Sequence, residues 1–363
     1  MGNGALRGNK SASLLDTASS HITAILTEVF ELSLGPSDKG RILLVYDEAT
    51  PLAHLLSAAY LHILGILSIL GVSGVSPNAT AIHFDRSDKG QIGQAIDSLS
   101  PGDLVILVQS TSFRLDAFRI RVHLFERGLK VIEHPHLGRV REEEFETYIA
   151  ALAYDSPYYH RVGQGLKDRL DRAGEVRLTS GEHVLVYGGG FETSKLNIGD
   201  YRGMKNVGGQ FPIGEVFTEL RDLTRLNGSI GLFAFGDQSF SVADCPTPIV
   251  IDIHEGRLVA SRHTVPGFEA VLQDIRNHEG EVWVRELGFG LNRALTRTSR
   301  ILNDVGIYER MCGVHLSLGS KHALYPKAGF HKKKVKFHVD VFAAVDSAAI
   351  DGEVVYQDGV YRL

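Results

Sequence analysis

The chain has 363 residues, of which 44% are hydrophobic and 22% are charged, and its net charge at pH 7 is −5. This composition is typical of a globular protein with room for two domains, and the small negative charge gives no reason to expect nucleic acid as a partner. The two cysteines, Cys245 and Cys312, form no CxxC pair and no disulfide framework, which is typical of a cytoplasmic protein.

The first half of the chain alternates between strand-like and helix-like segments. Apolar strands are expected at 40–46, 79–84, 103–109 and 129–134, with helices at 90–99 and around 115–128. Two further helices are expected at 142–153 and 158–173. Strands that are apolar throughout and alternate with helices predict a parallel sheet covered on both faces.

One apolar segment, PLAHLLSAAYLHILGILSILGV at 51–72, is about long enough to cross a membrane. It contains His54 and His62 as well as Ser57 and Ser68, and it lacks the basic and aromatic flanks of a membrane span. We therefore expect a helix buried in the α/β domain, and no membrane partner.

The second half has short strands and glycine-rich turns. Strands are expected within 175–180, 183–190, 229–236, 248–259, 281–290, 314–319, 335–345 and 353–362, and HEGR and QDGV are typical of hairpin turns. The predicted fold class is therefore α/β, with a mostly parallel α/β sheet domain over 1–174. A C-terminal α+β domain that binds metal is predicted to follow over 175–363.

Five polar residues of the second half lie in apolar settings. They are Glu215 in GEVFT, Glu286 in RELGFG, His315 in VHLSLG, and His338 and Asp340 in FHVDV. Successive strand side chains point to opposite faces, so His338 and Asp340 point the same way. Burying several unpaired carboxylates is expensive unless a cation offsets the cost. Carboxylates and imidazoles without a thiolate predict a divalent zinc, cobalt, manganese or iron site.

This donor set has enough negative charge for two ions. Three carboxylates balance much of the charge of two dications, and one carboxylate can bridge them. Pairs of metal ions occur in hydrolytic aminopeptidases, nucleases and phosphatases, where they activate water and polarise the bond to be cleaved.

The order of GEVFT, ELGFGLN, VHLSLG and FHVDV over about 205–345 resembles the thermophilic metallo-aminopeptidase family, the group of aminopeptidases T and S. Over the first half the likeness is only that of a general α/β domain. The resemblance implies an N-terminal α/β domain, a C-terminal domain with two metal ions, and a homodimer. It also implies five metal ligands: Glu215, Glu286, His315, His338 and Asp340.

The chain departs from this family at one ligand. The family has a metal-binding tyrosine seven residues after the first histidine, and here that position is His322. Tyr325 could take the tyrosine's place only if the loop shifts. Since histidine also binds metals, His322 joins the predicted ligand set, while the preference for a particular metal is left open.

Two segments are expected near the substrate. The turn NVGGQFPIGEV differs from the family's Asn-x-Pro-x-Gly-Glu form, so contacts near Gly208 and Gln210 are expected to differ as well. The basic run HKKKVK precedes the FHVDV strand. We interpret Lys332, Lys333 and Lys334 as an exposed turn, and leave open that one of them approaches an anionic group of the substrate.

Three functions remain open. The first is a two-metal aminopeptidase or amide hydrolase acting on short peptides or aminoacyl amides, with Glu215 or Glu286 moving a proton from water to the leaving amine. The second is a ring-cleaving dioxygenase with one non-haem iron. Dioxygenases of this kind are similar in overall fold to the aminopeptidases, but they have histidine at the Glu286 position and lack the GEVFT glutamate. The third is a homologue that has lost peptidase activity and serves a biosynthetic pathway; His322 keeps the last two open.

Overall fold

The chain forms two compact units. The computed structural model describes residues 2–29, 41–70, 79–87, 89–115, 118–199, 209–297, 302–327, 329–330 and 335–363. The first unit comprises Met1–Ser156 and Gly199–Ile213, and the second comprises Pro157–Ile198 and Gly214–Leu363. The protein therefore has the expected α/β class with two domains.

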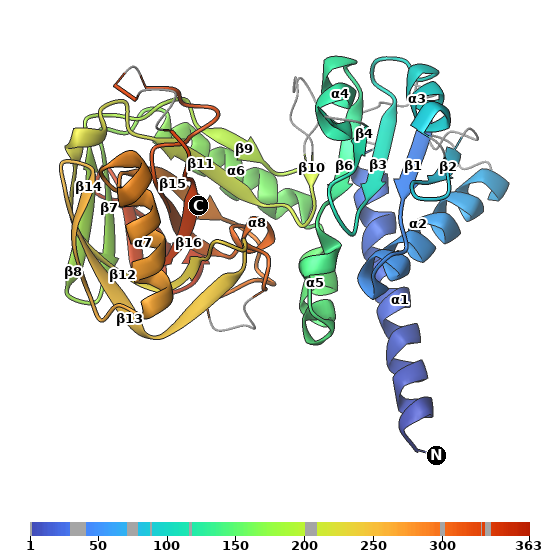
Figure 1. Cartoon of the computed structure of the whole chain (residues 1–363), viewed down its shortest axis with the longest axis horizontal. Coiled ribbons are helices and arrows are strands. Elements are labelled where there is room, and N and C mark those ends of the chain that lie inside the picture. Colours follow the sequence, from blue (N-terminus) through green and yellow to red (C-terminus); the bar gives the residue numbers. More distant parts are fainter. Residues whose placement is uncertain are drawn as a thin grey trace. The chain divides into compact units, whose positions relative to one another are not determined.

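The first unit is built on a parallel sheet (Figure 1). Among the described residues this sheet has five strands, and they are β10 (Gly209–Gln210), β6 (Lys130–His134), β3 (Leu104–Val108), β1 (Ile42–Tyr46) and β2 (Ala79–His83), in that spatial order. Every pairing between neighbours in it is parallel. A short antiparallel hairpin, β4 (Arg114–Leu115) with β5 (Phe118–Arg119), lies outside it.

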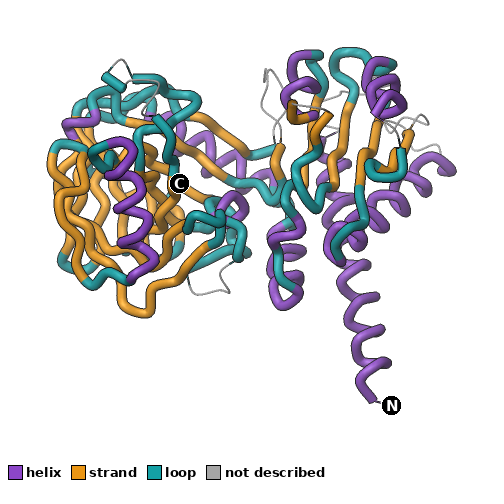
Figure 2. The backbone as a smooth tube through the Cα atoms, in the orientation of Figure 1, coloured by secondary structure: helices purple, strands orange, loops and turns teal. Residues whose placement is uncertain are grey.

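Helices cover this sheet on both faces (Figure 2). On one face, Leu43 and Val45 of β1 pack with Ile92 and Ile96 of one helix and Leu124 of another. On the other face, His134 of β6 is bonded to Tyr60 of a third helix. The helices are α1 (Gly2–Val29), α2 (Pro51–Leu70), α3 (Lys89–Asp97), α4 (Ile120–Glu126) and α5 (Phe145–Ala151), with 3-10 turns η2 (Leu137–Arg139) and η3 (Glu142–Glu144).

The apolar segment after Glu48 is the buried helix α2, as expected. Leu52, Leu56 and Tyr60 on this helix are fully buried. Within the described part of the chain, no helix is long and apolar enough to cross a membrane.

The second unit is built mainly of antiparallel strands. Within the described residues they form a sheet of 13 strands, and its main path runs β20-β19-β18-β7-β8-β12-β17-β16-β15-β11-β9, with β13 and β14 continuing from β12. The strands are β7 (Glu175–Ser180), β8 (His183–Gly188), β9 (Lys195–Asn197), β11 (Glu215–Glu219), β12 (Leu226–Gly236), β13 (Val242–His254), β14 (Arg257–Arg262), β15 (Val284–Gly290), β16 (Gly313–Leu318), β17 (Val339–Ala343), β18 (Ser347–Ile350), β19 (Glu353–Gln357) and β20 (Val360–Tyr361).

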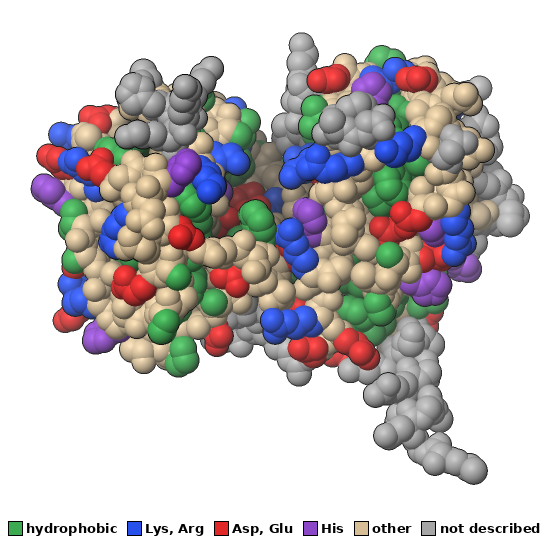
Figure 3. Space-filling view, in the orientation of Figure 1, with side chains coloured by type: hydrophobic (Ala, Val, Ile, Leu, Met, Phe, Trp, Pro, Cys, Tyr) green, Lys and Arg blue, Asp and Glu red, His purple; other side chains and the backbone are tan. Residues whose placement is uncertain are grey.

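Helices of this unit pack against the sheet. They are α6 (Ser156–Leu170), α7 (Pro266–Glu279) and α8 (Val305–Tyr308), with the 3-10 turn η4 (Leu223–Arg225). On the face that Figure 3 draws, acidic and basic side chains of the second unit are mixed and hydrophobic side chains are scattered, which is normal for a protein surface.

The division into units differs from the single boundary expected at 174/175. Nearly all of α6 belongs to the second unit, because it packs closely on that unit's strands: a Cβ at Gly163 would lie 2.8 Å from Ile198 Cγ2 and 2.9 Å from Leu196 Cδ1. Residues 199–213 belong to the first unit, because β10 extends its parallel sheet beside β6.

Candidate metal centre

Four neighbouring strands carry four of the six predicted ligands. The strands β17, β16, β15 and β11 are adjacent in the sheet. Glu215 begins β11 and lies opposite Gly290 of β15, while His315 of β16 lies opposite Gly288 of β15. Glu286, two residues before Gly288, is on the same face of β15 as this glycine. The register therefore directs side chains from three strands to one place.

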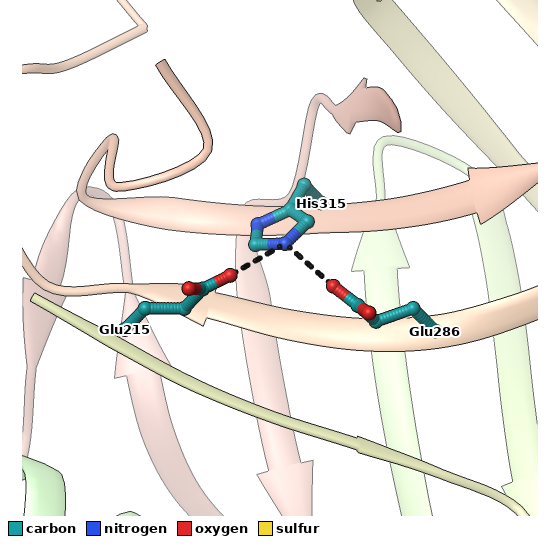
Figure 4. A group of neighbouring side chains, drawn as sticks. All are labelled: Glu215, Glu286 and His315. Atoms are coloured by element: carbon teal, nitrogen blue, oxygen red, sulfur yellow. Dashed lines mark hydrogen bonds and ion pairs between the residues drawn. The ribbon is translucent and has the colours of Figure 1, made fainter. Parts of the chain in front are cut away.

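Gly288 leaves the space that the His315 ring occupies. A Cβ at this glycine would lie 2.1 Å from both Cε1 and Nε2 of His315, far closer than atoms can approach. The imidazole thus lies across the backbone of β15 and reaches between Glu215 and Glu286 (Figure 4). The glycine in RELGFG is part of the site even though it has no side chain.

Glu215, Glu286 and His315 form the first ligand group. His315 Nε2 lies 3.3 Å from Glu215 Oε1 and 3.3 Å from Glu286 Oε1, and all three residues are buried. One ligand atom from each lies within 4.8 Å of the others, which is close enough for one metal ion to bind all three. Burial disfavours a charged imidazole, but hydrogen bonds to the two carboxylates outweigh it and raise the pKa of His315 to about 9.

Glu286, His338 and Asp340 form the second ligand group, and their ligand atoms also lie within 4.8 Å of one another. His322 adjoins this group, since its Nε2 is 2.7 Å from Glu286 Oε2. His338 Nε2 is 3.2 Å from Asp340 Oδ1. Burial disfavours a charged His338, but the attraction of Asp340 outweighs it and raises the pKa of His338 to about 10.

Glu286 belongs to both groups. Its Oε1 faces His315 and its Oε2 faces His322. Burial alone would raise the pKa of this carboxyl, but hydrogen bonds to His315 and His322 dominate and hold the pKa well below its usual range. Glu286 is therefore ionised at neutral pH, and its two oxygens face two different histidines.

The residues present fit two divalent ions. Three carboxylates and three imidazoles suit zinc, cobalt, manganese or iron. Asp340 is buried, and among the described residues its Oδ1 contacts His338 Nε2 at 3.2 Å but accepts no well-aligned hydrogen bond. A buried carboxylate oxygen with so little compensation is costly, and a bound cation would reduce that cost.

The hydroxyl of Tyr325, the alternative to His322, is bonded to the backbone and not to a predicted ligand. Its hydroxyl donates to the carbonyl oxygen of Thr193 at 2.8 Å, and its ring lies 4.7 Å from the ring of His322 between centroids. His322 therefore lies beside Glu286, and the ring of Tyr325 packs against the ring of His322.

Two buried arginines flank the site and were not predicted. Arg310 Nη2 lies 3.5 Å from Glu215 Oε2, and its Nε has no hydrogen-bond partner in the described part of the chain. Arg285 makes two hydrogen bonds of 2.8 Å to Glu219 and also donates to the carbonyl oxygens of Ser320 and Tyr325. Arg285 thereby fixes the loop that carries His322.

The two segments expected near the substrate are only partly described. Gly208 and the lysines at 332, 333 and 334 lie outside the described residues. Gln210 is in β10 of the first unit.

Two solved structures share the fold of nearly the whole chain. The 2,5-dihydroxypyridine dioxygenase from Pseudomonas putida KT2440 is 13% identical, with a TM-score of 0.63 over 97% of each chain. Wild-type AmpT from Thermus thermophilus is 14% identical, with a TM-score of 0.55 over 97% of this chain and 99% of its own. No protein-family model and no curated protein sequence matches the chain. At these identities the likeness shows a shared fold.

Proposed function

We propose that this chain is a metal-dependent aminopeptidase or related amide hydrolase that uses two divalent ions to activate water. The observation that carries this proposal is the position of Glu286, whose two oxygens face two different groups of ligands. A site for one ion does not need a carboxylate shared in this way. The fold shared with AmpT, an aminopeptidase, also supports it.

Each residue has a role in this proposal. Glu215 and His315 would hold one ion, and His322, His338 and Asp340 the other, with Glu286 binding both. Bound there, the ions would polarise a peptide carbonyl and make a water molecule acidic enough to react near neutral pH. A carboxylate must then carry the proton to the leaving amine. We assign this step to Glu215, because only its Oε1 faces a histidine, whereas both oxygens of Glu286 do. Its other oxygen, Oε2, lies 3.5 Å from Arg310 Nη2.

The substrate and the assembly follow from the resemblance in sequence. Short peptides or aminoacyl amides are the proposed substrates, and a cytoplasmic homodimer is the proposed form. The free amino group of the substrate would bind at one ion or at a nearby carboxylate.

A dioxygenase with one non-haem iron is the second candidate. The TM-score with the dihydroxypyridine dioxygenase, 0.63, exceeds the 0.55 with AmpT, and the three histidines allow a site of two histidines and one carboxylate. The second ligand group argues for the hydrolase, because a single iron bound by Glu215, Glu286 and His315 leaves the buried carboxylate of Asp340 without a metal ion. A repurposed homologue without peptidase activity would bind metal and turn over no aminoacyl amide.

The test is hydrolysis of a panel of aminoacyl anilides by metal-free protein reloaded with zinc, manganese or cobalt. We expect turnover, and we expect His338→Ala and Asp340→Ala to lower kcat/KM by at least about 100-fold, since loss of an outer partner of a metal ligand alone typically costs 10- to 100-fold. His254→Ala removes an exposed histidine of the same unit and should retain activity. No turnover with any ion, or full activity in the Asp340 variant, would contradict the proposal.

A further inference from the structure

The carboxylate at the end of α7 receives three backbone N–H groups. Glu279 Oε2 accepts from Ser320 N at 2.7 Å, and Oε1 accepts from Lys336 N at 2.9 Å and from Phe337 N at 2.8 Å. Hydrogen bonds to an ionised carboxylate are about twice as strong as bonds between neutral groups. One side chain therefore holds two separate segments of the chain.

Each segment carries one histidine of the site: His338 belongs to the second ligand group, and His322 adjoins it. Ser320 lies two residues before His322, and Phe337 immediately precedes His338. The segments also contact each other, since Lys321 N donates to Phe337 O at 2.9 Å and His338 Nδ1 lies 3.0 Å from Lys321 O. The distance between the ring centroids of His322 and His338 is 5.6 Å.

These segments lie outside the regular strands. β16 ends at Leu318 before His322, and β17 begins at Val339 after His338. Their backbone N–H groups therefore need hydrogen-bond partners other than a complete sheet ladder. A displacement of about 1 Å in the functional side chains of an active site can lower its activity by about 100-fold. By contrast, three ligands lie within strands and pair there: Glu286 with Glu219 of β11, His315 with Gly288 of β15, and Asp340 with Ser317 of β16.

We propose that Glu279 is a positioning residue that sets the spacing of His322 and His338 and so determines the affinity of the second ligand group for its ion. This inference rests on the proposed two-metal function. It makes a selective prediction: the first ligand group, held by β11, β15 and β16, does not depend on Glu279.

The experiment titrates metal-free protein with zinc by calorimetry and with cobalt by absorption spectroscopy. Glu279→Ala should raise the dissociation constant of one of the two ions by about 10- to 100-fold and leave the other within about 2-fold. Glu279→Gln keeps an oxygen for one segment but turns an NH2 group toward the other, so its loss should be smaller. Glu269→Gln and Glu269→Ala are the matched controls, since Glu269 is exposed on the same helix, about 15 Å away along its axis.

A second readout requires no metal. Hydrogen exchange of the Ser320, Lys336 and Phe337 amides should speed up in metal-free Glu279→Ala and stay unchanged in the Glu269 variants. Equal weakening of both ions, or two unchanged affinities, would overturn the role of Glu279. If the unsubstituted protein binds one ion or none, the proposed function fails instead; faster exchange at these amides in Glu279→Ala would then still support the clamp on the two loops, and unchanged exchange would refute it.

Discussion

His315 reaches its carboxylates only because residue 288 has no side chain. The ring occupies the position that a Cβ would take, with Cε1 and Nε2 each 2.1 Å from it. The sequence predicted His315 as a ligand, yet it did not predict this dependence, since the register of β15 against β16 decides which residue the ring crosses.

Gly288→Ala is therefore expected to displace His315 and to remove the ion of the first ligand group. The new Cβ would meet the far end of the His315 side chain, so the clash is relieved by moving the imidazole away from Glu215 and Glu286. Metal content after dialysis should fall by about one ion per chain relative to the unsubstituted protein. Gly267→Ala is the control, because its Cβ would meet Phe235 at an ordinary 3.4 Å. Unchanged metal content in Gly288→Ala would show that metal binding does not depend on the space that Gly288 leaves for the His315 ring.

The sequence has His322 where the family that it resembles has a metal-binding tyrosine. Substitutions of His322 and Tyr325 test which of the two residues binds metal. Tyr325→Phe should keep its full metal content, because the hydroxyl is bonded to the carbonyl of Thr193 and not to a ligand group. His322→Ala should weaken binding of one ion by at least about 10-fold. The opposite pattern, with metal lost only from Tyr325→Phe, would show that the tyrosine is the ligand.

The predicted ligands stand out in the sequence, whereas the residues that contact them do not. Glu215, Glu286, His315, His338 and Asp340 stand in short motifs of fixed order. Arg285, Arg310 and Glu279 act through carbonyls, amides and a carboxylate from distant parts of the chain, and no local pattern marks them.

At the scale of elements, α6 shows how tightly the second unit is packed. Gly163 faces Ile198 and Leu196, whereas a Cβ at Gly165, two residues along the same helix, would meet Leu363 at 3.6 Å. Gly165→Ala should be neutral or stabilise the protein by up to about 1 kcal/mol through helix propensity. Gly163→Ala gains the same propensity but must push two side chains aside, so we expect it to be less stable than Gly165→Ala by about 1–3 kcal/mol.

Urea unfolding followed by the fluorescence of Trp283, the one tryptophan of the chain, measures this difference in the second unit. Equal free energies of unfolding for the two alanine variants would show that α6 does not pack closely on β9.

Most helices and strands could be predicted from the sequence, but two helices were missed. The hairpin signals in HEGR and QDGV are confirmed, since Glu255, Gly256, Asp358 and Gly359 all have positive φ. α7 was missed, although Pro266 at its first turn and the buried series Phe268, Val271, Leu272 and Ile275 are typical of an amphipathic helix. α1 was missed as well.

At the scale of the whole molecule, the two units should respond oppositely to pH. His134 is buried between Tyr60 and Tyr148, and burial lowers its pKa to about 3. The unfolded chain takes up a proton near pH 6.5 that folded His134 does not, so the first unit loses stability as pH falls from 7 to 5. The folded-state pKa values of His315 and His338 are raised to about 9 and about 10, so their contribution in metal-free protein is lost as pH rises from the unfolded value of about 6.5 through these values.

Urea midpoints of metal-free protein at pH 5, 7 and 9 test this. Trp283 fluorescence reports the second unit, and hydrogen exchange of peptides from 41–70 and 118–156 after a urea pulse reports the first. We expect the first unit to be weakest at pH 5 and the second at pH 9. Midpoints that move in parallel would contradict the assignment of these charges.

The expected fold class is confirmed. The division into two units, by contrast, could not be predicted from local sequence patterns. α6 reads as a charged helix after the parallel sheet, but its place is decided by the side chains it meets on β9. The return of 209–210 to the first unit depends on a two-residue pairing with β6. Contacts between residues this far apart in sequence leave no periodic signal.

We propose that Glu286 joins two ions in one centre. Elemental mass spectrometry of protein purified without a histidine tag or chelator tests this role of Glu286. We expect about two zinc, manganese or cobalt ions per chain, and at most one in Glu286→Gln, where the shared ligand loses its charge. A single iron per chain in the unsubstituted protein, or two ions retained by Glu286→Gln, would contradict it.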